Sequence, residues 1–186
     1  MDSFTHFSTI FAPVVLSATY TTQIDFYNRH ISGLMVFKSM NDTTERVVFM
    51  TETGFKFFDF EFHPNGFKVQ YIIPSLNKKF IVNTFRNDIS YLLIPPIKSS
   101  IHPQIKNDTC TLFKFSKSKS NCYYYSNKQC TELHRIEVGT DRKKSLTIEL
   151  AGKQNKNPET INIVHHSFKL IIFLKQIDTH ADSTTP

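Results

Sequence analysis

Paired acidic side chains are the first residues in this 186-residue chain whose types and spacing could do chemistry. Asp59 and Glu61 stand two positions apart, and Phe58, Phe60 and Phe62 alternate with them. Two carboxyl groups on the same side of a strand could share acid–base work. Such pairs more often lie on the solvated face of a sheet. We therefore expect Asp59 and Glu61 to sit in water.

Histidine gives a second candidate for chemistry, since His165 and His166 are adjacent. On a strand, neighbouring side chains point to opposite faces, which disfavours joint ligation of a metal. The other histidines are scattered and form no HExxH motif. GxSxG, P-loop and GxGxxG motifs are absent as well. We expect no enzymatic activity, no metal and no cofactor.

Cys110, Cys122 and Cys130 are the only cysteines, and no CxxC or CxxH motif joins them. Structural zinc is therefore not expected. An odd count leaves two arrangements open, one disulfide with one free thiol or three buried thiols. The three tyrosines that follow Cys122 indicate a strand there rather than a nucleophile elbow.

The charge balance is basic, with 22 Lys and Arg against 16 Asp and Glu and a net charge of +6. No stretch packs five or more basic residues together, so a Lys-rich solvent face is favoured over a nucleic-acid site. The segment FKFSKSKSNCYYY could stack bases beside lysines, or it could be a hairpin with a basic turn. No nucleic-acid partner is expected, and an intracellular basic binding module is retained as the weakest hypothesis.

The elements that must position these side chains are mostly strands. Period-two alternation of apolar and polar residues predicts strands over 17–27, 31–39, 44–51, 55–62 and 67–73. Asn41-Asp42 and Pro64-Asn65-Gly66 mark turns between them. Alternation resumes in the second half and predicts strands over 111–115, 121–126, 132–137, 145–150, 160–164 and 168–177.

A helix separates the two sets of strands. Apolar residues recur at i, i+4 spacing from Ser75 to Leu93, with Ser75 as N-cap, and Pro95-Pro96 ends the run. A connector follows over 95–108. Short sequential strands indicate an antiparallel meander or open barrel, and the helix should cover its concave face or open mouth.

The expected organisation is an N-terminal lead-in over 1–16, a single domain over 17–178 and a disordered tail over 179–186. The lead-in has an apolar stretch but no basic n-region, and no run approaches the roughly 20 apolar residues that span a bilayer. Taken literally, the chain is cytoplasmic. The alternative is that an export signal lies upstream of it.

The alternating pattern also selects the side chains that should face the interior. Val48 and Met50 are expected on the same side as the phenylalanines of the following strand. Two interpretations remain open for this set, a wall that holds lipid or a core packed by its own aromatics. The candidate cavity and lid residues are Tyr20, Ile24, Phe26, Met35, Phe37, Val48, Met50, Phe58, Phe60, Phe62, Phe80, Phe85 and Ile89.

Several segments resemble an uncharacterised family of outer-membrane lipoproteins of Gram-negative bacteria, and more distantly the Lol-type lipoprotein carrier and acceptor proteins. The segments are HISGLMVFK, ERVVFMTETGFKFFDFEF, FKVQYIIPSLNKKFIVNTFRNDISYLL and NPETINIVHHSFKLIIFLKQI. The resemblance covers roughly residues 18–177. No cysteine near the start matches a lipidated one, and Arg46 is not matched to a functional arginine of the carriers.

The resemblance implies a mainly β fold (α+β), an open antiparallel half-barrel of about 10–11 strands with one central amphipathic helix as lid. It implies a non-enzymatic, monomeric cell-envelope protein of the periplasm or outer membrane. Such a protein would bind lipid or an acylated lipoprotein partner in an apolar cavity. The alternative is a structural or interaction lipoprotein of the same fold, with a filled core and no small-molecule ligand.

Overall fold

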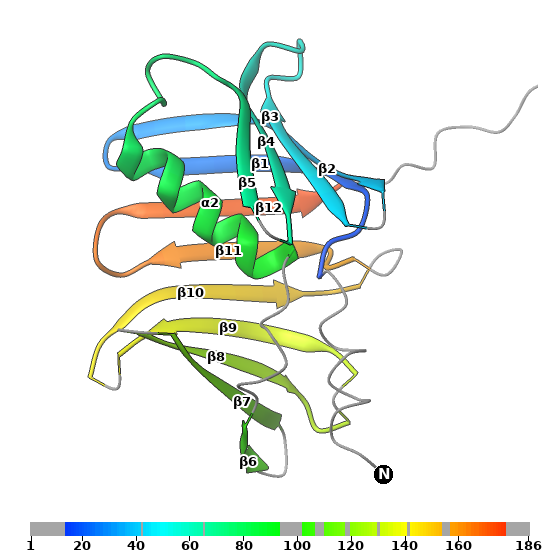
Figure 1. Ribbon diagram of the computed structural model, residues 1–186, viewed down its shortest axis with the longest axis vertical. Coiled ribbons are helices and arrows are strands. Elements are labelled where there is room, and N and C mark those ends of the chain that lie inside the picture. The colour runs from blue at the N-terminus through cyan, green and yellow to red at the C-terminus, as the bar shows by residue number, and fades with distance from the viewer. Residues whose placement is uncertain are drawn as a thin grey trace, which may run out of the picture.

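The computed structural model describes residues 14–41, 43–64, 66–93, 102–106, 110–117, 120–129, 131–140, 142–153 and 157–177. These residues form one antiparallel sheet of twelve strands and one helix (Figure 1). The strands before the helix are β1 (Ala18–Phe26), β2 (Arg29–Asn41), β3 (Thr44–Met50), β4 (Lys56–His63) and β5 (Gly66–Ile72). The helix is α2 (Lys79–Leu93). The strands after it are β6 (His102–Lys106), β7 (Cys110–Lys117), β8 (Ser120–Asn127), β9 (Leu133–Gly139), β10 (Lys144–Ala151), β11 (Thr160–His165) and β12 (Leu170–Gln176).

The strand order is β5-β4-β3-β2-β1-β12-β11-β10-β9-β8-β7-β6. All neighbours in this order are also neighbours in the chain except β1 and β12, which join the two halves of the sequence. The outermost strands, β5 and β6, do not pair with each other, so the sheet is not closed. The predicted fold class, an open antiparallel half-barrel with one helix, is confirmed.

The sheet holds one strand more than the sequence predicts, because β6 lies inside the expected 95–108 connector. Its Pro103 has no amide hydrogen to give to a neighbouring strand. An edge strand tolerates this loss because one of its sides is unpaired. The sequence pattern did not predict β6 because the segment is short and has a proline near its start.

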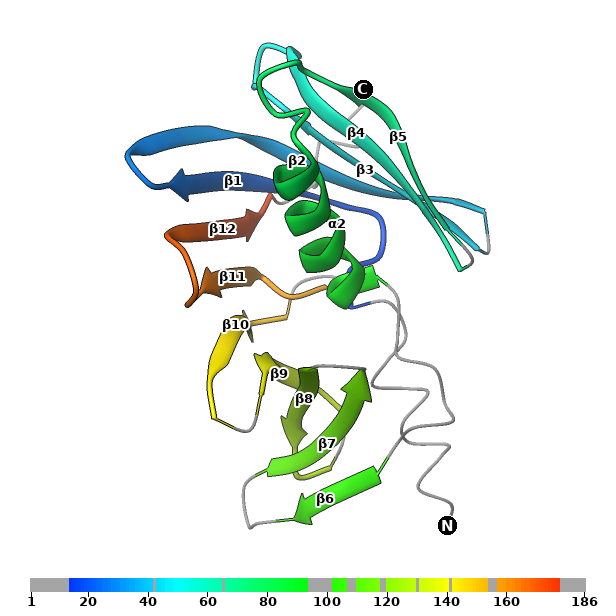
Figure 2. The same ribbon diagram turned by 60° about the vertical axis from the view of Figure 1, so that its left-hand side comes forward.

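Alternating burial explains why these segments form strands. Along β1 and β12 every second side chain is buried and the residues between them face solvent. The buried side chains of both halves join one hydrophobic cluster with those of α2. The sheet curves so that β2–β5 and β7–β10 lie on either side of the helix (Figure 2). The core is therefore the concave face of the sheet together with one face of α2.

The helix begins later than the sequence predicts. The amides of Leu76 and Asn77 both donate to the carbonyl of Ile73, at 3.0 and 3.1 Å, so Ser75 lies in a turn and is not the N-cap. The first helical hydrogen bond runs from the amide of Val82 to the carbonyl of Lys78 at 3.0 Å. Helix α2 extends to Leu93, where the prediction also ends it.

Some predicted features lie outside the described residues. These are most of the 1–16 lead-in, the 179–186 tail, Pro95-Pro96, Cys130 and the side chain of Cys110. Cys122 lies on β8, so the predicted strand is confirmed, and its buried thiol is not part of a disulfide. Within the described ranges, no helix is both long enough and apolar enough to cross a membrane.

Candidate functional site

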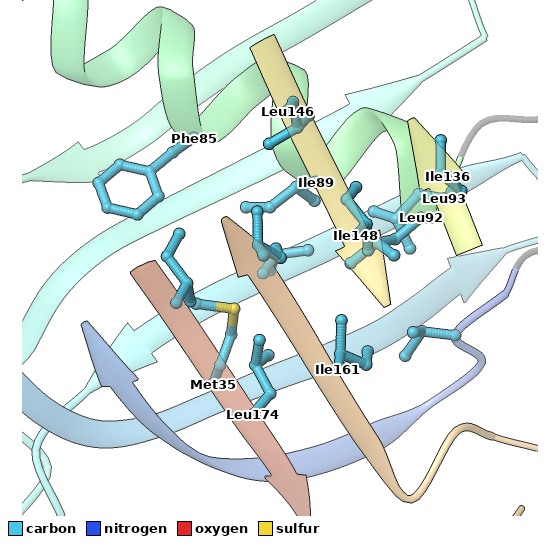
Figure 3. Close-up of a cluster of buried hydrophobic side chains, with 14 of the residues drawn as sticks. Met35, Phe85, Ile89, Leu92, Leu93, Ile136, Leu146, Ile148, Ile161 and Leu174 are labelled. Carbon is cyan, nitrogen blue, oxygen red and sulfur yellow. The ribbon is translucent and has the colours of Figure 1, made fainter. Parts of the chain in front are cut away.

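The contact between α2 and the sheet is the centre of the molecule and its candidate site. Phe85, Ile89, Leu92 and Leu93 are buried, and their spacing places them on one face of the helix. Figure 3 shows these side chains directed toward residues of the sheet. A helix that buries one continuous apolar stripe against a sheet is held mainly by non-directional hydrophobic contact.

The sheet side of this contact draws on both halves of the chain. Buried aliphatic side chains from seven strands, β1–β3 and β9–β12, belong to the same cluster as the helix residues. Those labelled in Figure 3 are Met35 from β2, Ile136 from β9, Leu146 and Ile148 from β10, Ile161 from β11 and Leu174 from β12. In this arrangement the side chains of α2 and of the sheet form one continuous buried cluster.

Aromatic rings dominate the part of the contact formed by β4. The rings of Phe58 and Phe60 stack with centroids 4.3 Å apart, and Phe85 of the helix lies 5.2 Å from Phe58. Phe67 of β5 extends the group with an edge contact to Phe60 at 5.1 Å. Ring pairs at these separations add about 0.5–1.5 kcal/mol each beyond their burial. They stabilise the side of α2 that faces β4 and β5.

Ten of the thirteen predicted cavity or lid residues lie in or against the core. Phe26 is half-buried and packs on the hydrophobic cluster. The other nine are buried: Tyr20, Ile24, Met35, Phe37, Phe58, Phe60, Phe62, Phe85 and Ile89. Contact of these residues with a ligand stays a prediction.

The expected placement of Val48 and Met50 is wrong. The register puts Phe49 opposite Phe58, whereas Val48 lies opposite Asp59 on the outer face. Val47 and Phe49 are the buried apolar residues of β3, and Val48 and Met50 are half-buried. Because β3 is apolar at four consecutive positions, alternation does not determine which two of them face inward.

The prediction that Phe80 faces the interior is also wrong. Its side chain is 54% exposed in the first turn of α2. The ring makes an edge contact with Phe168, in the turn between β11 and β12, with centroids 5.0 Å apart. Phe80 therefore lies at the rim of the helix–sheet contact and not within it.

A buried polar pair, which the sequence does not predict, crosses the contact. Asp88 on α2 is 1% exposed, and its Oδ2 lies 2.9 Å from Nε2 of His165 at the end of β11. Burial raises the pKa of the Asp88 carboxyl, and the hydrogen bond and charge of His165 act against that rise. The neighbouring His166 instead hydrogen-bonds Thr147 at 2.8 Å. The two histidines thus have different partners, and because His166 lies beyond the end of β11, the prediction that they point to opposite faces of a strand stays a prediction.

The expectation that Asp59 sits in water is wrong. Asp59 is 1% exposed on the outer face of β4 because two cations cover it. Arg46 of β3 donates from Nε and Nη2 to its two carboxylate oxygens at 2.7 and 2.8 Å, and Lys56 donates at 2.7 Å. Burial acts to raise the pKa of Asp59, but these hydrogen bonds outweigh it and hold that pKa low. The arrangement is a structural ion cluster on β3 and β4.

Glu61 does not join Asp59 in an acid pair. Its carboxylate accepts hydrogen bonds from Gln70 and contacts His63, each at 2.7 Å. Its side chain remains partly exposed, as expected. Each carboxylate is thus occupied by its own partners, and no geometry for shared acid–base work results.

Tyrosine hydroxyls satisfy other polar atoms around the core. The hydroxyl of Tyr20 donates to the carbonyl of Pro158 at 3.0 Å, which ties β1 to the segment before β11. Burial raises the pKa of Tyr91, on α2, to about 12, with smaller contributions from Cys122 and Asp88.

Among the described residues, no group of three or more His, Cys, Asp or Glu is placed to hold a metal ion.

Comparisons with known proteins agree with this architecture. No family model and no curated protein matches the sequence. A LolA superfamily protein from Nitrosomonas europaea superposes with a TM-score of 0.63 over 96% of this chain and 92% of that chain, at 9% identity. A protein domain from Vibrio parahaemolyticus, described as outer membrane lipoprotein-sorting, superposes with a TM-score of 0.52 over 89% and 86%, at 12% identity. At these identities the likeness establishes the fold, and the distant similarity to Lol-type proteins that the sequence indicates is confirmed at that level.

Proposed function

We propose that this protein is a non-enzymatic binding protein of the cell envelope that takes up a lipid, or the acyl chains of an acylated protein, between α2 and the sheet. The observation that carries the proposal is α2, the one helix among the described residues, whose apolar stripe covers the concave face of an unclosed sheet. A closed barrel could admit a ligand only through its mouth. An open sheet can admit one by displacement of the helix.

The contacts of α2 fit a helix that moves. Side chains of the helix form one continuous buried cluster with those of the sheet, so an acyl chain must replace Phe85, Ile89 and their neighbours. Each buried methylene of the ligand contributes about 0.8 kcal/mol. A chain of about a dozen methylenes would therefore offset most of the free energy that is lost when the buried side chains of α2 leave the sheet. Among the described residues, the hydrogen bonds that join the helix to the rest of the chain include Asp88 to His165 and the amide of Val14 to the carbonyl of Leu92.

The cellular place of the protein is part of the same proposal. The similar structures are described as a LolA superfamily protein and an outer membrane lipoprotein-sorting domain. A protein of this fold that handles acyl chains would work in the periplasm, beside the outer membrane, as a monomer. A lipid or a lipoprotein would be its partner.

A structural or interaction protein with a permanently filled core is the second candidate. The continuous packing between α2 and the sheet favours it, because the buried side chains form one cluster. In that case the protein would act through its surface, and α2 would never leave the sheet.

One experiment distinguishes the two candidates. The full chain is purified from a bacterial host without detergent, extracted with organic solvent and analysed for lipid by mass spectrometry. Stoichiometric phospholipid or fatty acid from the folded monomer is the expected result. A lipid-free extract, together with failure of the folded protein to take up a fluorescent fatty acid, would overturn the binding function in favour of the structural one.

A matched pair of variants locates the ligand if one is found. Phe85→Ala should change the affinity for the fluorescent fatty acid, because Phe85 lies in the helix–sheet contact. Phe80→Ala, on the exposed side of the same helix, should leave that affinity unchanged. Equal effects of the two substitutions would place the ligand elsewhere.

A further inference from the structure

Three segments meet at one end of the half-barrel and carry exposed aromatic and basic side chains. They are the β1–β2 turn, the β11–β12 turn and the start of α2, which lie on the same side of the molecule in Figure 1. The amide of Tyr27 donates to the carbonyl of Lys169 at 3.0 Å, and the ring of Phe80 contacts Phe168. The segments therefore form one continuous surface. We name it the rim patch, and it consists of Tyr27, Arg29, Lys78, Lys79, Phe80 and Lys169.

The two aromatic rings of the rim patch are unusually exposed for their type. Tyr27 is 55% exposed and Phe80 is 54% exposed; among the described residues Phe55, at 56%, is the only other aromatic ring as exposed, and ten rings are buried. Single exposed apolar residues are common on protein surfaces. Phe80 contacts Phe168, and the backbone of Tyr27 is hydrogen-bonded to the next residue, Lys169, so two exposed rings and the nearby cations form a larger amphipathic feature. A feature of this kind is typical of an interaction surface.

The backbone conformation of Tyr27 independently supports a functional role for the β1–β2 turn. Its φ is 52°, and it is the one non-glycine residue with positive φ among those described. Left-handed backbone disfavours a bulky side chain, and glycine or asparagine would fit the turn with less strain. The turn holds a tyrosine in spite of that strain. Residues kept in such conformations cluster at functional positions.

The four cations of the rim patch are exposed and available for a ligand. Within the described part of the chain, none of them makes an ion pair. The carboxylate on the adjoining part of β1, Asp25, is engaged by His30 at 2.7 Å. The surface thus has a net positive charge without internal compensation, so it would attract a polyanion.

We infer that the rim patch docks the protein on the surface of an anionic phospholipid bilayer. Tyrosine and other amphipathic rings settle at the level of the headgroups, while lysine and arginine reach the phosphates. A ring pair beside several cations matches that layered surface better than it matches a folded acidic protein. Docking does not depend on the proposed binding of lipid between α2 and the sheet. It would, however, bring the first turn of α2 to the membrane.

Vesicle binding of the full chain tests the inference. The protein is co-sedimented with vesicles of phosphatidylcholine alone and of phosphatidylcholine mixed with phosphatidylglycerol. We expect binding to the anionic vesicles only, with most of it lost at 0.5 M salt because screening weakens surface electrostatics. Failure to bind anionic vesicles at low salt would overturn the inference.

Variants of the cations test the electrostatic part. Each lysine near an anionic surface strengthens binding about fivefold, so Lys78→Gln with Lys79→Gln should weaken it by at least about tenfold. The matched control is Lys38→Gln with Lys153→Gln, which removes the same charge from outside the rim patch. An equal loss in the control would show attraction by net charge alone and would overturn the assignment of the patch.

Substitution of Tyr27 separates docking from stability. Tyr27→Asn relieves the backbone strain, so thermal unfolding should be unchanged or shifted upward while vesicle binding falls several-fold. The control is Met40→Ser, an exposed apolar residue at the far end of β2. Equal vesicle binding by Tyr27→Asn and wild type would contradict the inference.

The same variants decide between a membrane and other polyanions. If a short DNA duplex competes with anionic vesicles, binds more tightly than they do and loses affinity in the lysine variant, the partner is nucleic acid and the inference is wrong. The lipid content measured for the proposed function should be the same in Tyr27→Asn and wild type. Docking and internal lipid binding can therefore fail separately.

Discussion

Asp88 Oδ2, on the buried face of α2, lies 2.9 Å from His165 Nε2 at the end of β11. The pair joins residues 77 positions apart, and both side chains are nearly removed from solvent. It is a directed polar contact within a helix–sheet interface that is otherwise apolar. Its strength therefore depends on protonation, whereas the packing around it does not.

Asp88→Asn should change how stability depends on pH. Burial raises the folded-state pKa of Asp88 above its ordinary value, so folding takes up a proton between the unfolded and folded pKa values. Stability of the wild type then falls as pH rises from about 4 through the folded pKa. The asparagine variant lacks this decline, so its stability relative to wild type should increase from pH 4 to pH 7 in urea unfolding.

The exposed pair of Asp25 and His30 provides the control for this measurement. Its atoms lie 2.7 Å apart, slightly closer than those of Asp88 and His165, but both side chains are about half exposed. Asp25→Asn should change stability by less than about 0.5 kcal/mol at any pH in this range, since exposed pairs contribute little. A pH-independent difference between Asp88→Asn and wild type would rule out the titration of Asp88.

Phe85→Ala should destabilise the protein by about 3–4 kcal/mol, because the ring is buried and contacts Phe58 across the helix–sheet interface. Phe80→Ala, five positions earlier on the same helix, should change the free energy of unfolding by less than about 1 kcal/mol. Denaturant unfolding measures both. A small effect at Phe85 would mean that α2 contributes little to the stability of the sheet.

A charged substitution tests the same face more severely. Ile89→Asp places a carboxylate in the apolar contact without a partner, so it should prevent folding or release α2 from the sheet. Circular dichroism and protease resistance distinguish these outcomes. A variant that stays folded and still retains lipid would argue against α2 as a lid.

Periodicity predicted most of the elements but could not decide which face of β3 is buried. Strands such as β1 and β12 alternate cleanly, so their buried residues follow from the sequence. In β3, Val47, Val48, Phe49 and Met50 are all apolar, and either pair could face inward. Pairing with β4, which puts Val47 opposite Phe60 and Phe49 opposite Phe58, decides the outcome. Tertiary pairing of this kind leaves no local signal.

Asp88 shows the limit of sequence reasoning for the candidate site. Its spacing from Phe85 and Leu92 places it on the apolar face of α2, and a carboxyl there requires a partner. That signal was available in the helical pattern. The identity of the partner was not, because only the pairing of β1 with β12 brings β11 beneath the helix. Asp59 is similar, since its burial depends on cations from β3 and β4.

Asp59→Asn should lower stability at neutral pH by about 2 kcal/mol. Arg46 and Lys56 hydrogen-bond the buried carboxylate, but both are partly exposed and solvent weakens their contribution. The folded pKa of Asp59 is depressed, so its contribution is present above about pH 4 and disappears as pH falls through the folded pKa. Urea unfolding should show the two proteins converging at low pH. A constant difference down to pH 2 would contradict the ion cluster.

Gly33→Ala should destabilise the protein by about 2–3 kcal/mol, because a methyl group at this position of β2 would collide with the carbonyl oxygen of Met50 on β3. The ring of Phe49 would lie only 3.2 Å from the same methyl, so there is no room for it to move inward. Gly66→Ala is the matched control, since open space surrounds Gly66 in the β4–β5 hairpin and its φ is not positive. That substitution should be neutral or slightly stabilising through the unfolded chain. Equal thermal stability of the two variants would show that β2 and β3 approach each other less closely than the structure has them.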